Sequence, residues 1–491
     1  MRFGRRARER RRHVSVGGAL LVRGTLTSVP SSAVVLFTRD LRLHDNPALE
    51  LASREFERVV PLFVLEPALV ARSARRTAFL FECLHSLDDL LRERGGRLIV
   101  RRGDTIREVV RVASVVGARA VFVARDASER AKRREADLTA IGRQLEVRLV
   151  DSHSVMPPGA IAPSHGDHYR VFTPYWRAWL KAPWRPVVDP PVRVVLPDDP
   201  TGALASEPLP EPSATLDVGR RWPGGETEAR RRASAWLASG CRTYDQTRNQ
   251  LAVDGTSRLS PYLRFGCISA LELAHAAAPG EFSRQLCWRD FFHQVLQANP
   301  WSEGRDLRPV ARTWDTDTEL LDRWAAGETG YPVVDAGMRQ LAQEGWMHNR
   351  ARLIVASFLT KHLNLDWKLG ARHFDRLLLD GDPANNAGGW QWAADTGVDA
   401  RPGRMFNPTL QARRFDPDGA YVRRYVPELS GLSAEAVHEP WRVAGAPARL
   451  HYPAPIIDHR AAVARYRAQR ATGQTVPSTE RGGSEEWVSN A

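Results

Sequence analysis

The sequence predicts an α/β domain with a doubly wound, parallel five-stranded sheet, followed after a long linker by an all-α domain. Three observations support this expectation. Short, continuously apolar runs alternate with helix-period segments up to about residue 150, which is typical of buried parallel strands. Nine prolines occur between residues 182 and 212. From about residue 226, helical patterns rich in Trp, Leu and Arg replace the strand signals.

Five apolar runs are expected to form the sheet, and the segment between the second and third has helical periodicity. The expected strands are 33–37, 59–65, 97–100, 120–124 and 145–150, and the helical segment is 78–94. No G-x-G-x-x-G motif follows the first run. A standard dinucleotide site is therefore not expected in this half of the chain.

The expected organisation has five parts. They are a disordered basic extension (1–32), the α/β domain (33–160), the interdomain linker (161–225), the helical domain (226–471) and a disordered tail (472–491). The basic extension also has the composition of a nucleic-acid arm, a transit peptide or the start of a secretory signal.

The composition is that of a globular protein with a basic surface. The 491 residues carry a net charge of +13, of which residues 1–30 supply +7 through eight Arg and one Glu. The remaining excess suggests a polyanionic partner, although a solvated surface excess explains it equally well. No apolar run is long enough to cross a membrane, and the four cysteines lack metal-binding spacing. We therefore expect a cytoplasmic protein without a metal site. We also expect it to be a monomer.

The segment DGTSRLSPYL (254–263) places small hydroxyl side chains next to a basic residue. Thr256, Ser257 and Ser260 surround Arg258, and Pro261 follows at the expected start of a helix. Hydroxyl groups beside exposed backbone amides suit a phosphate group. A plain helix cap is the more common use of such residues.

The segment RQLCWRDFFHQVL (284–296) has helical spacing. Gln285, Trp288 and Phe292 fall along one helical face. An amide beside a large flat ring could hold a nucleobase by its edge and its face. An ordinary amphipathic helix with a buried Trp is the alternative.

The segment GWMHNRARLIVASFL (345–359) also has helical spacing that brings side chains together on one face. Asn349 and Leu353 are four residues apart, so both face one site, while Arg350 and Arg352 point elsewhere. One of the two arginines could meet a phosphate, and the other could pair with a carboxylate such as Asp380.

The segment DGDPANNAGGWQWAADTGVD (380–399) has the most unusual combination of residue types in the chain. Two carboxylates precede a proline, two Asn, two Gly and two Trp. The paired glycines permit close approach to a flat group. Trp390 and Trp392 lie about 200° apart on a helix, so they serve different surfaces.

Together these four segments resemble the photolyase/cryptochrome family, and AVVLFTRDLRLHDNPAL (33–49) resembles that family's first strand and the helix after it. The resemblance covers residues 33 to 470 and is greatest to bacterial class I photolyases of cyclobutane pyrimidine dimers. It implies an antenna domain, a linker and a helical domain that holds U-shaped FAD. The implied activity is light-driven DNA repair by a carbon–carbon lyase.

The resemblance also implies a set of cofactor contacts. The flavin phosphates and ribityl chain would meet Tyr244, Thr256, Ser257, Arg258, Leu259 and Ser260, and the rest of the flavin site would include Trp288, Arg352, Asp380, Gly381, Asp382 and Asn386. Arg352 would pair with Asp380. Asn386 would face flavin N5, where an amide favours the fully reduced anionic flavin used in repair; plant cryptochromes have Asp there.

Two further groups of residues follow from the resemblance. Electrons would pass from Trp314 at the surface through Trp367 to Trp390 beside the flavin. The expected DNA contacts are Arg248, Gln285, Trp288, Arg289, Phe292, Asn349, Arg350, Leu353 and Trp392. A flipped lesion in single- or double-stranded DNA would lie between Trp288 and Trp392, with Gln285 and Asn349 reading its edges.

Two positions depart from the family pattern for cyclobutane dimers. Gln285 stands where Glu is usual and Leu353 where Met is usual. Gln also occurs there in (6-4) photolyases and animal cryptochromes, but the (6-4) enzymes carry two His in place of Asn349 and Leu353. Cyclobutane dimers are therefore the favoured substrate, and a cryptochrome-like light sensor is the alternative function. The antenna, methenyltetrahydrofolate or 8-hydroxy-5-deazaflavin, remains open.

Overall fold

The computed structural model describes residues 31–142, 145–199, 202, 204–211, 222–399, 403–445 and 449–473. Residues 1–30 and 474–491 lie outside this part, and with them almost all of the predicted basic extension and tail. The two expectations for those segments therefore stay predictions.

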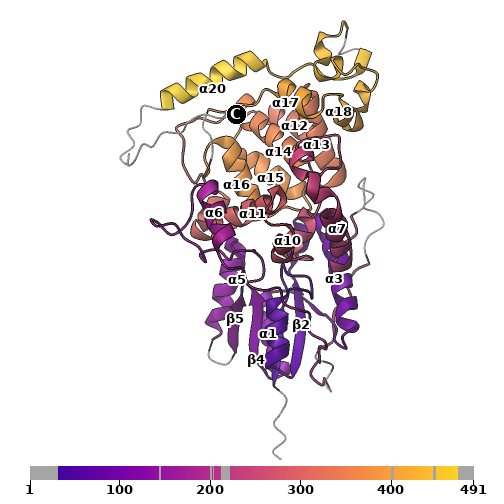
Figure 1. Ribbon diagram of the computed structural model, residues 1–491, viewed down its shortest axis with the longest axis vertical. Helices are drawn as coiled ribbons and strands as arrows, with labels where there is room; N and C mark the ends of the chain where they lie inside the picture. The colour runs from indigo at the N-terminus through magenta and orange to yellow at the C-terminus, as the bar shows by residue number, and fades with distance from the viewer. Residues whose placement is uncertain are drawn as a thin grey trace, which may run out of the picture. The chain divides into compact units, whose positions relative to one another are not determined.

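The first part of the described chain forms one parallel sheet, shown in indigo and purple in Figure 1. Its strands are β1 (Ser32–Leu36), β2 (Arg58–Leu65), β3 (Ile99–Arg102), β4 (Ala118–Ala124) and β5 (Glu146–Val150). Their order in the sheet is β3-β2-β1-β4-β5, and every neighbouring pair is parallel. The chain thus starts in the middle and winds outward in both directions, which confirms the predicted fold class.

Helices connect successive strands. They are α1 (Pro47–Glu55), α2 (Pro67–Ala71), α3 (Ala74–Arg92), α4 (Thr105–Val115) and α5 (Glu129–Ala140). Asn46, Ser73, Asp104 and Ser128 each accept a backbone N–H bond at the start of one of them. The helix predicted at 78–94 is therefore confirmed as part of α3, which begins earlier because Ser73 caps it.

Both faces of the sheet are buried, and one of them joins the helical half. Along β1, Val34 and Leu36 pack in a core on one face, whereas Ala33 and Val35 belong to a core on the other. The second core also contains Tyr262 and other side chains of the helical half. The sheet therefore supports the helical elements directly.

The predicted linker contains one helix. α6 (Phe172–Lys181) buries Phe172, Tyr175 and Trp179. The described residues from 183 to 211 contain neither helix nor strand, as their proline content predicts.

The remainder is helical, shown in magenta to yellow in Figure 1. The α-helices are α7 (Glu226–Ala238), α8 (Tyr244–Thr247), α9 (Ser260–Phe265), α10 (Ala270–Ala277), α11 (Glu281–Ala298), α12 (Thr318–Ala326), α13 (Pro332–Glu344), α14 (Asn349–Ser357), α15 (Trp367–Leu377), α16 (Pro383–Ala394), α17 (Pro408–Phe415), α18 (Ala420–Tyr425) and α20 (His459–Gly473). Shorter helical turns are η1 (Gly240–Thr243), η2 (Pro300–Glu303), η3 (Phe358–His362), η4 (Pro427–Leu429), η5 (Ala436–His438) and η6 (Pro440–Arg442). A separate core joins α13, α14, α15 and α16.

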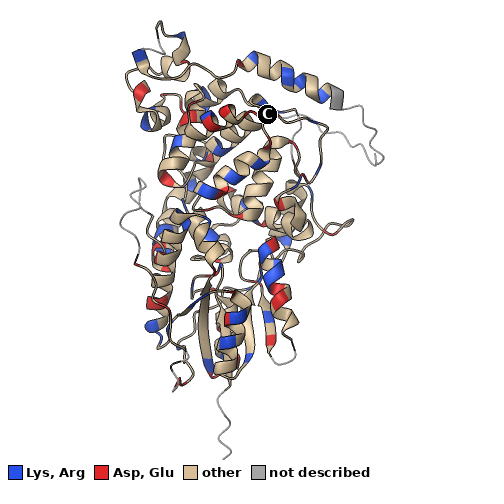
Figure 2. Ribbon diagram, turned by 180° about the vertical axis from the view of Figure 1, so that it is seen from behind, with Lys and Arg blue, Asp and Glu red and all other residues tan. Residues whose placement is uncertain are grey.

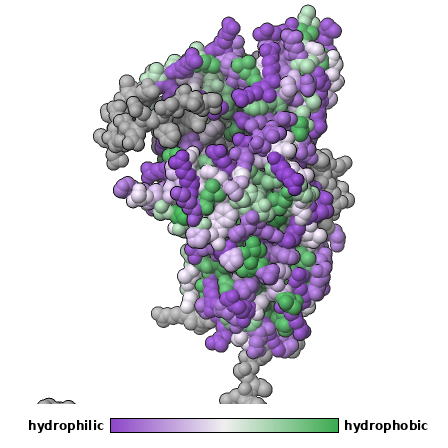
Figure 3. All heavy atoms as spheres, in the orientation of Figure 1, coloured by the Kyte–Doolittle hydropathy of each residue, from purple (hydrophilic) through white to green (hydrophobic). Residues whose placement is uncertain are grey.

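The surface is rich in charge. Lys and Arg recur along α20 and other helices in Figure 2. On the face shown in Figure 3, hydrophilic residues dominate and apolar ones form small separate patches. Among the described helices, none combines the length and the apolar character that a membrane crossing requires.

Candidate flavin site and DNA face

The turn before α9 holds the predicted phosphate-binding segment, and its side chains bond mainly to the protein. Arg258 has a left-handed backbone (φ 51°) and pairs with Asp254 at 2.6 Å and Glu344 at 3.1 Å. The Ser257 hydroxyl accepts the Leu259 N–H at 3.3 Å. The charge of Arg258 is therefore already balanced by two carboxylates, which the sequence did not predict.

The hydroxyl residues of this turn are only partly buried. Ser260 accepts a hydrogen bond from the Trp346 indole at 3.2 Å, and Thr256 is partly buried. Tyr244 packs edge-on against Trp236 and Phe282, and burial raises its pKa to about 12. Its phenol is thus neutral and can only act as a hydrogen-bonding group.

Arg352 and Asp380 form the predicted ion pair, at 2.8 Å, and this prediction is confirmed. Arg352 also donates to the Met347 carbonyl at 2.8 Å, which fixes the orientation of the guanidinium. The second carboxylate oxygen of Asp380 is buried and has no hydrogen-bond partner among the described residues. A buried acceptor without a partner is costly, so Asp380 fits a ligand that donates a hydroxyl or N–H there.

The carboxylate of Asp382 faces the α/β domain. It caps α16 by accepting the Asn385 N–H at 2.9 Å, and it pairs with Arg39 and with His293. Burial raises the pKa of Asp382, but His293 and Arg39 outweigh this and hold it well below its usual range. The side chain of Asp382 is thus committed to a network rather than free to meet a cofactor.

This network links the two halves of the chain. Arg39, which follows β1, contacts both Asp126 at 2.9 Å and Asp382. The ring of His293 stacks on His153 with centroids 5.3 Å apart. Sequence reasoning missed these residues, although Arg39 stands inside the quoted segment 33–49.

Helix α16 presents different surfaces to its neighbours. The amide of Asn386 donates to the Ala371 carbonyl at 3.0 Å. A Cβ at Gly388 would meet the Phe292 ring at 2.2 Å, whereas a Cβ at Gly389 would meet nothing within 4 Å. Gly388 therefore allows α11 and α16 to approach, whereas Gly389 borders open space.

The three tryptophans predicted to carry electrons lie on contacting segments. Trp390 is 2% exposed and packs directly on Gly370, one turn after Trp367 in α15. Trp367 is fully buried, and its indole donates to Asp306 at 2.7 Å. Trp314 is partly exposed, and the backbone of the next residue bonds to the Asn364 carbonyl at 2.9 Å. The segments thus run from a buried Trp to a partly exposed Trp, and the electron route itself stays a prediction.

Residues expected to contact DNA occupy several environments. Gln285 and Arg248 both bond to Glu281, at 2.9 and 2.7 Å. Trp288 stacks face to face on Phe172, with centroids 3.7 Å apart, so α6 covers one side of its ring. Gly381, one of the predicted flavin contacts, accepts a hydrogen bond from Arg264 at its backbone carbonyl, at 2.7 Å.

On the neighbouring helices, Asn349 is exposed and Leu353 is partly buried. Arg350 bonds to Asn249 at 2.6 Å and stacks 4.4 Å from the centre of the Phe415 ring. The Trp392 indole donates to the Asp399 carbonyl at 3.0 Å.

Arg289 is placed differently from the expectation. Its side chain is buried and donates to the His153 carbonyl at 2.9 Å. A buried guanidinium beside the network of Asp382 does not lie where a DNA phosphate could reach it. Helical periodicity explains the difference, because Arg289 follows Trp288 directly and so falls on another face of α11.

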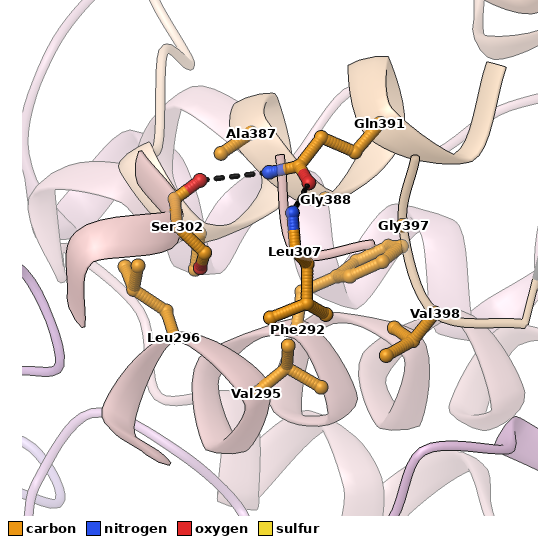
Figure 4. Close-up of a pocket in the computed structure, with 11 residues that line it drawn as sticks. Phe292, Val295, Leu296, Ser302, Leu307, Ala387, Gly388, Gln391, Gly397 and Val398 are labelled. Atoms are coloured by element: carbon orange, nitrogen blue, oxygen red, sulfur yellow. Dashed lines mark hydrogen bonds between the residues drawn. The ribbon is translucent and has the colours of Figure 1, made fainter. Parts of the chain in front are cut away.

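A small apolar cavity lies between α11 and α16 (Figure 4). Phe292 is the single predicted site residue among its lining side chains. The Gln391 amide bonds to the Ser302 carbonyl and the Leu307 N–H, at 2.7 Å each, so its polar groups are satisfied. Asn386 is not among the residues that line this cavity, and we assign the cavity no ligand.

Two family models match the chain. Residues 33–193 match the DNA photolyase family, and residues 282–472 match the FAD binding domain of DNA photolyase. The chain is 48% identical to the deoxyribodipyrimidine photo-lyase of Streptomyces griseus, over 90% of this chain and 99% of the relative. This chain belongs to the DNA photolyase family.

Other photolyases extend the comparison. The Escherichia coli deoxyribodipyrimidine photo-lyase is 36% identical, over 89% of this chain and 98% of the relative. The crystal structure of a class III photolyase from Agrobacterium tumefaciens matches with a TM-score of 0.85 at 34% identity, over 92% of this chain and 100% of the other. The expected family, fold and photo-lyase activity class are thus confirmed.

Proposed function

We propose that this photolyase repairs cyclobutane pyrimidine dimers in DNA by light-driven electron transfer from bound FAD. The binding of FAD is supported mainly by Asp380. Arg352 holds one oxygen of its carboxylate, and the other oxygen is buried without a hydrogen-bond partner among the described residues. The chemistry that FAD supplies when bound and fully reduced is the donation of an electron to the lesion under blue light, after which the ring splits and the electron returns.

The residues around this position fit the cofactor. The Asp380 oxygen suits a hydroxyl of the ribityl chain, and the open space at Gly389 suits a flat ring. The amide of Asn386 carries no acidic proton, which suits a flavin kept in its reduced anionic form. Tyr244 and the turn at 256–260 would hold the phosphates and ribityl chain.

The tryptophan segments would deliver electrons to the cofactor. Trp314 is partly exposed and, once it has lost an electron to Trp367, can accept one from a reductant in solution, whereas Trp367 and Trp390 are shielded from water. The order Trp314, Trp367, Trp390 therefore leads from the surface inward.

The lesion would flip out of the DNA and lie against Trp288 and Trp392. Phe172 covers one face of Trp288, and the residue is only partly buried, which supports contact with a base there. Asn349 and Gln285 offer amides to the pyrimidine edges, and Arg248 and Arg350 supply positive charge for the backbone. We propose that the protein acts as a cytoplasmic monomer on single- or double-stranded damaged DNA.

A second chromophore in the α/β domain is part of the proposal, either methenyltetrahydrofolate or 8-hydroxy-5-deazaflavin. The photolyase of Sulfolobus tokodaii, which matches with a TM-score of 0.78 at 29% identity, contains two FAD molecules. A light-sensing role without repair is the second candidate. It is favoured by a TM-score of 0.80 to the Synechocystis cryptochrome, at 28% identity, and by Gln285.

The choice of lesion is tested with two oligonucleotides, one carrying a cyclobutane thymine dimer and the other a (6-4) photoproduct. We expect blue light to restore only the first, because Asn349 and Leu353 offer no imidazole for proton transfer to the second. Restoration of the (6-4) product alone would overturn the assignment, and restoration of neither would favour the sensor.

A further inference from the structure

Arg312 lies beside Trp314, the partly exposed member of the series Trp314, Trp367 and Trp390. The proposed function assigns no role to Arg312. Its guanidinium carbon is 4.3 Å from the centre of the Trp314 ring and 5.3 Å from that of Tyr466 in α20. The cation is thus held against the one partly exposed tryptophan of the series.

Neutral oxygens hold this guanidinium in place. It donates to the Asn364 side-chain oxygen at 2.9 Å and to the Thr360 carbonyl. Among the described residues, no carboxylate pairs with it at salt-bridge distance. Asp395 and Asp315 lie farther off, and Arg465 adds a like charge.

The guanidinium remains charged. Burial lowers the pKa of Arg312 to about 10, with Tyr466 and Asp395 acting in the opposite direction. A full positive charge therefore lies over the Trp314 ring at neutral pH. It attracts the electron-rich ring of neutral Trp314, but it repels a radical cation at the same place.

We propose that Arg312 drives the loss of the indole proton from oxidised Trp314 and so traps the separated charge. This inference rests on the proposed function. Trp314 gives one electron to oxidised Trp367 and becomes a radical cation. Its N–H bond then breaks, the proton passes to water, and a neutral indolyl radical remains. A thiol in solution returns a hydrogen atom, which restores Trp314.

Removal of that proton relieves the repulsion, because the neutral radical carries no charge against Arg312. The electron cannot return to the neutral radical unless a proton returns as well. Arg312 acts through Trp314 and not on the flavin, so it is a positioning residue with an electrostatic effect.

The experiment follows the tryptophan radicals by transient absorption after a laser flash on the FAD-loaded protein, and it measures the lifetime of the protonated radical cation. In Arg312→Gln the lifetime should increase by about tenfold, since each unit of pKa is a factor of ten in proton affinity. Arg312→Lys should retain most of the short lifetime. Arg305→Gln, at an exposed position outside these contacts, is the matched control and should match the wild type.

A second variant leaves Arg312 in place. Asn364→Asp sets a carboxylate against the guanidinium and should also lengthen the lifetime, even if Arg312→Gln does not fold. Unchanged lifetimes in the folded variants, with radicals still formed, would overturn this inference alone. If the wild type forms no tryptophan radical, the proposed electron route fails and this inference with it.

Discussion

At the scale of single residues, the electron route depends most directly on Trp390. It is nearly fully buried, packs on Gly370 and belongs to the same helix as Asn386. We expect Trp390→Phe to slow photoreduction of the flavin by at least about tenfold, because phenylalanine is much harder to oxidise than an indole.

The measurement is the rate at which oxidised flavin absorbance bleaches under blue light with a thiol present. Repair by chemically reduced Trp390→Phe should remain close to the wild type and serves as the control. Unchanged bleaching would show that Trp390 is not the residue that passes electrons to the flavin.

The sequence predicted some residue contacts and missed others for a physical reason. The pairing of Arg352 with Asp380 follows from opposite charges in two motifs that serve one site. The burial of Arg289 was not foreseen, because periodicity assigns a residue to a face of α11 without saying what covers that face. His153 and Arg39, which lie against that face, come from distant parts of the sequence.

At the scale of elements, the two glycines of α16 have opposite environments. A methyl group at Gly388 would overlap the Phe292 ring of α11, whereas one at Gly389 would enter open space. Gly388→Ala should therefore destabilise the fold by about 1–3 kcal/mol, the usual cost of overpacking.

Gly389→Ala is the matched control for this prediction. It should leave the apoprotein as stable or slightly more stable, since Ala has the better helix propensity by about 1 kcal/mol. Urea unfolding of both variants without FAD measures the difference. Equal stability of the two variants would contradict the close contact between α11 and α16.

The sheet could be predicted strand by strand, since each apolar run is long enough to be a strand and too short for a buried helix. Helix α6 was not predicted, although it contributes Phe172 to the Trp288 stack. The prolines that follow it made the whole region resemble a linker, and the aromatic face of α6 becomes informative only once α11 lies against it.

At the scale of the whole molecule, ion pairs join the α/β and helical halves. Asp126 lies beside Arg39, which in turn contacts Asp382 at the start of α16. Burial raises the pKa of Asp126, but the positive charges of Arg39 and His293 have the larger effect and lower this pKa to about 2. Because its folded pKa is below the unfolded value, Asp126 stabilises the fold fully above about pH 4, and this contribution is lost as pH falls toward 2.

We therefore expect Asp126→Asn to cost about 2 kcal/mol of unfolding free energy at pH 7 and to reduce the loss of stability below pH 4. Urea titrations at several pH values measure both effects. Asp137→Asn, at an exposed carboxylate of α5, is the control and should follow the wild type. Identical acid profiles for Asp126→Asn and the wild type would contradict the proposed stabilisation across the two halves.

In the proposed function, light acting through reduced FAD drives repair of the cyclobutane dimer. Its most direct measurement mixes the fully reduced protein with an oligonucleotide carrying one thymine dimer and follows the return of thymine absorbance, in blue light and in the dark. We expect loss of the dimer in the light and none in the dark. An intact dimer after illumination, with FAD bound and fully reduced, would contradict it.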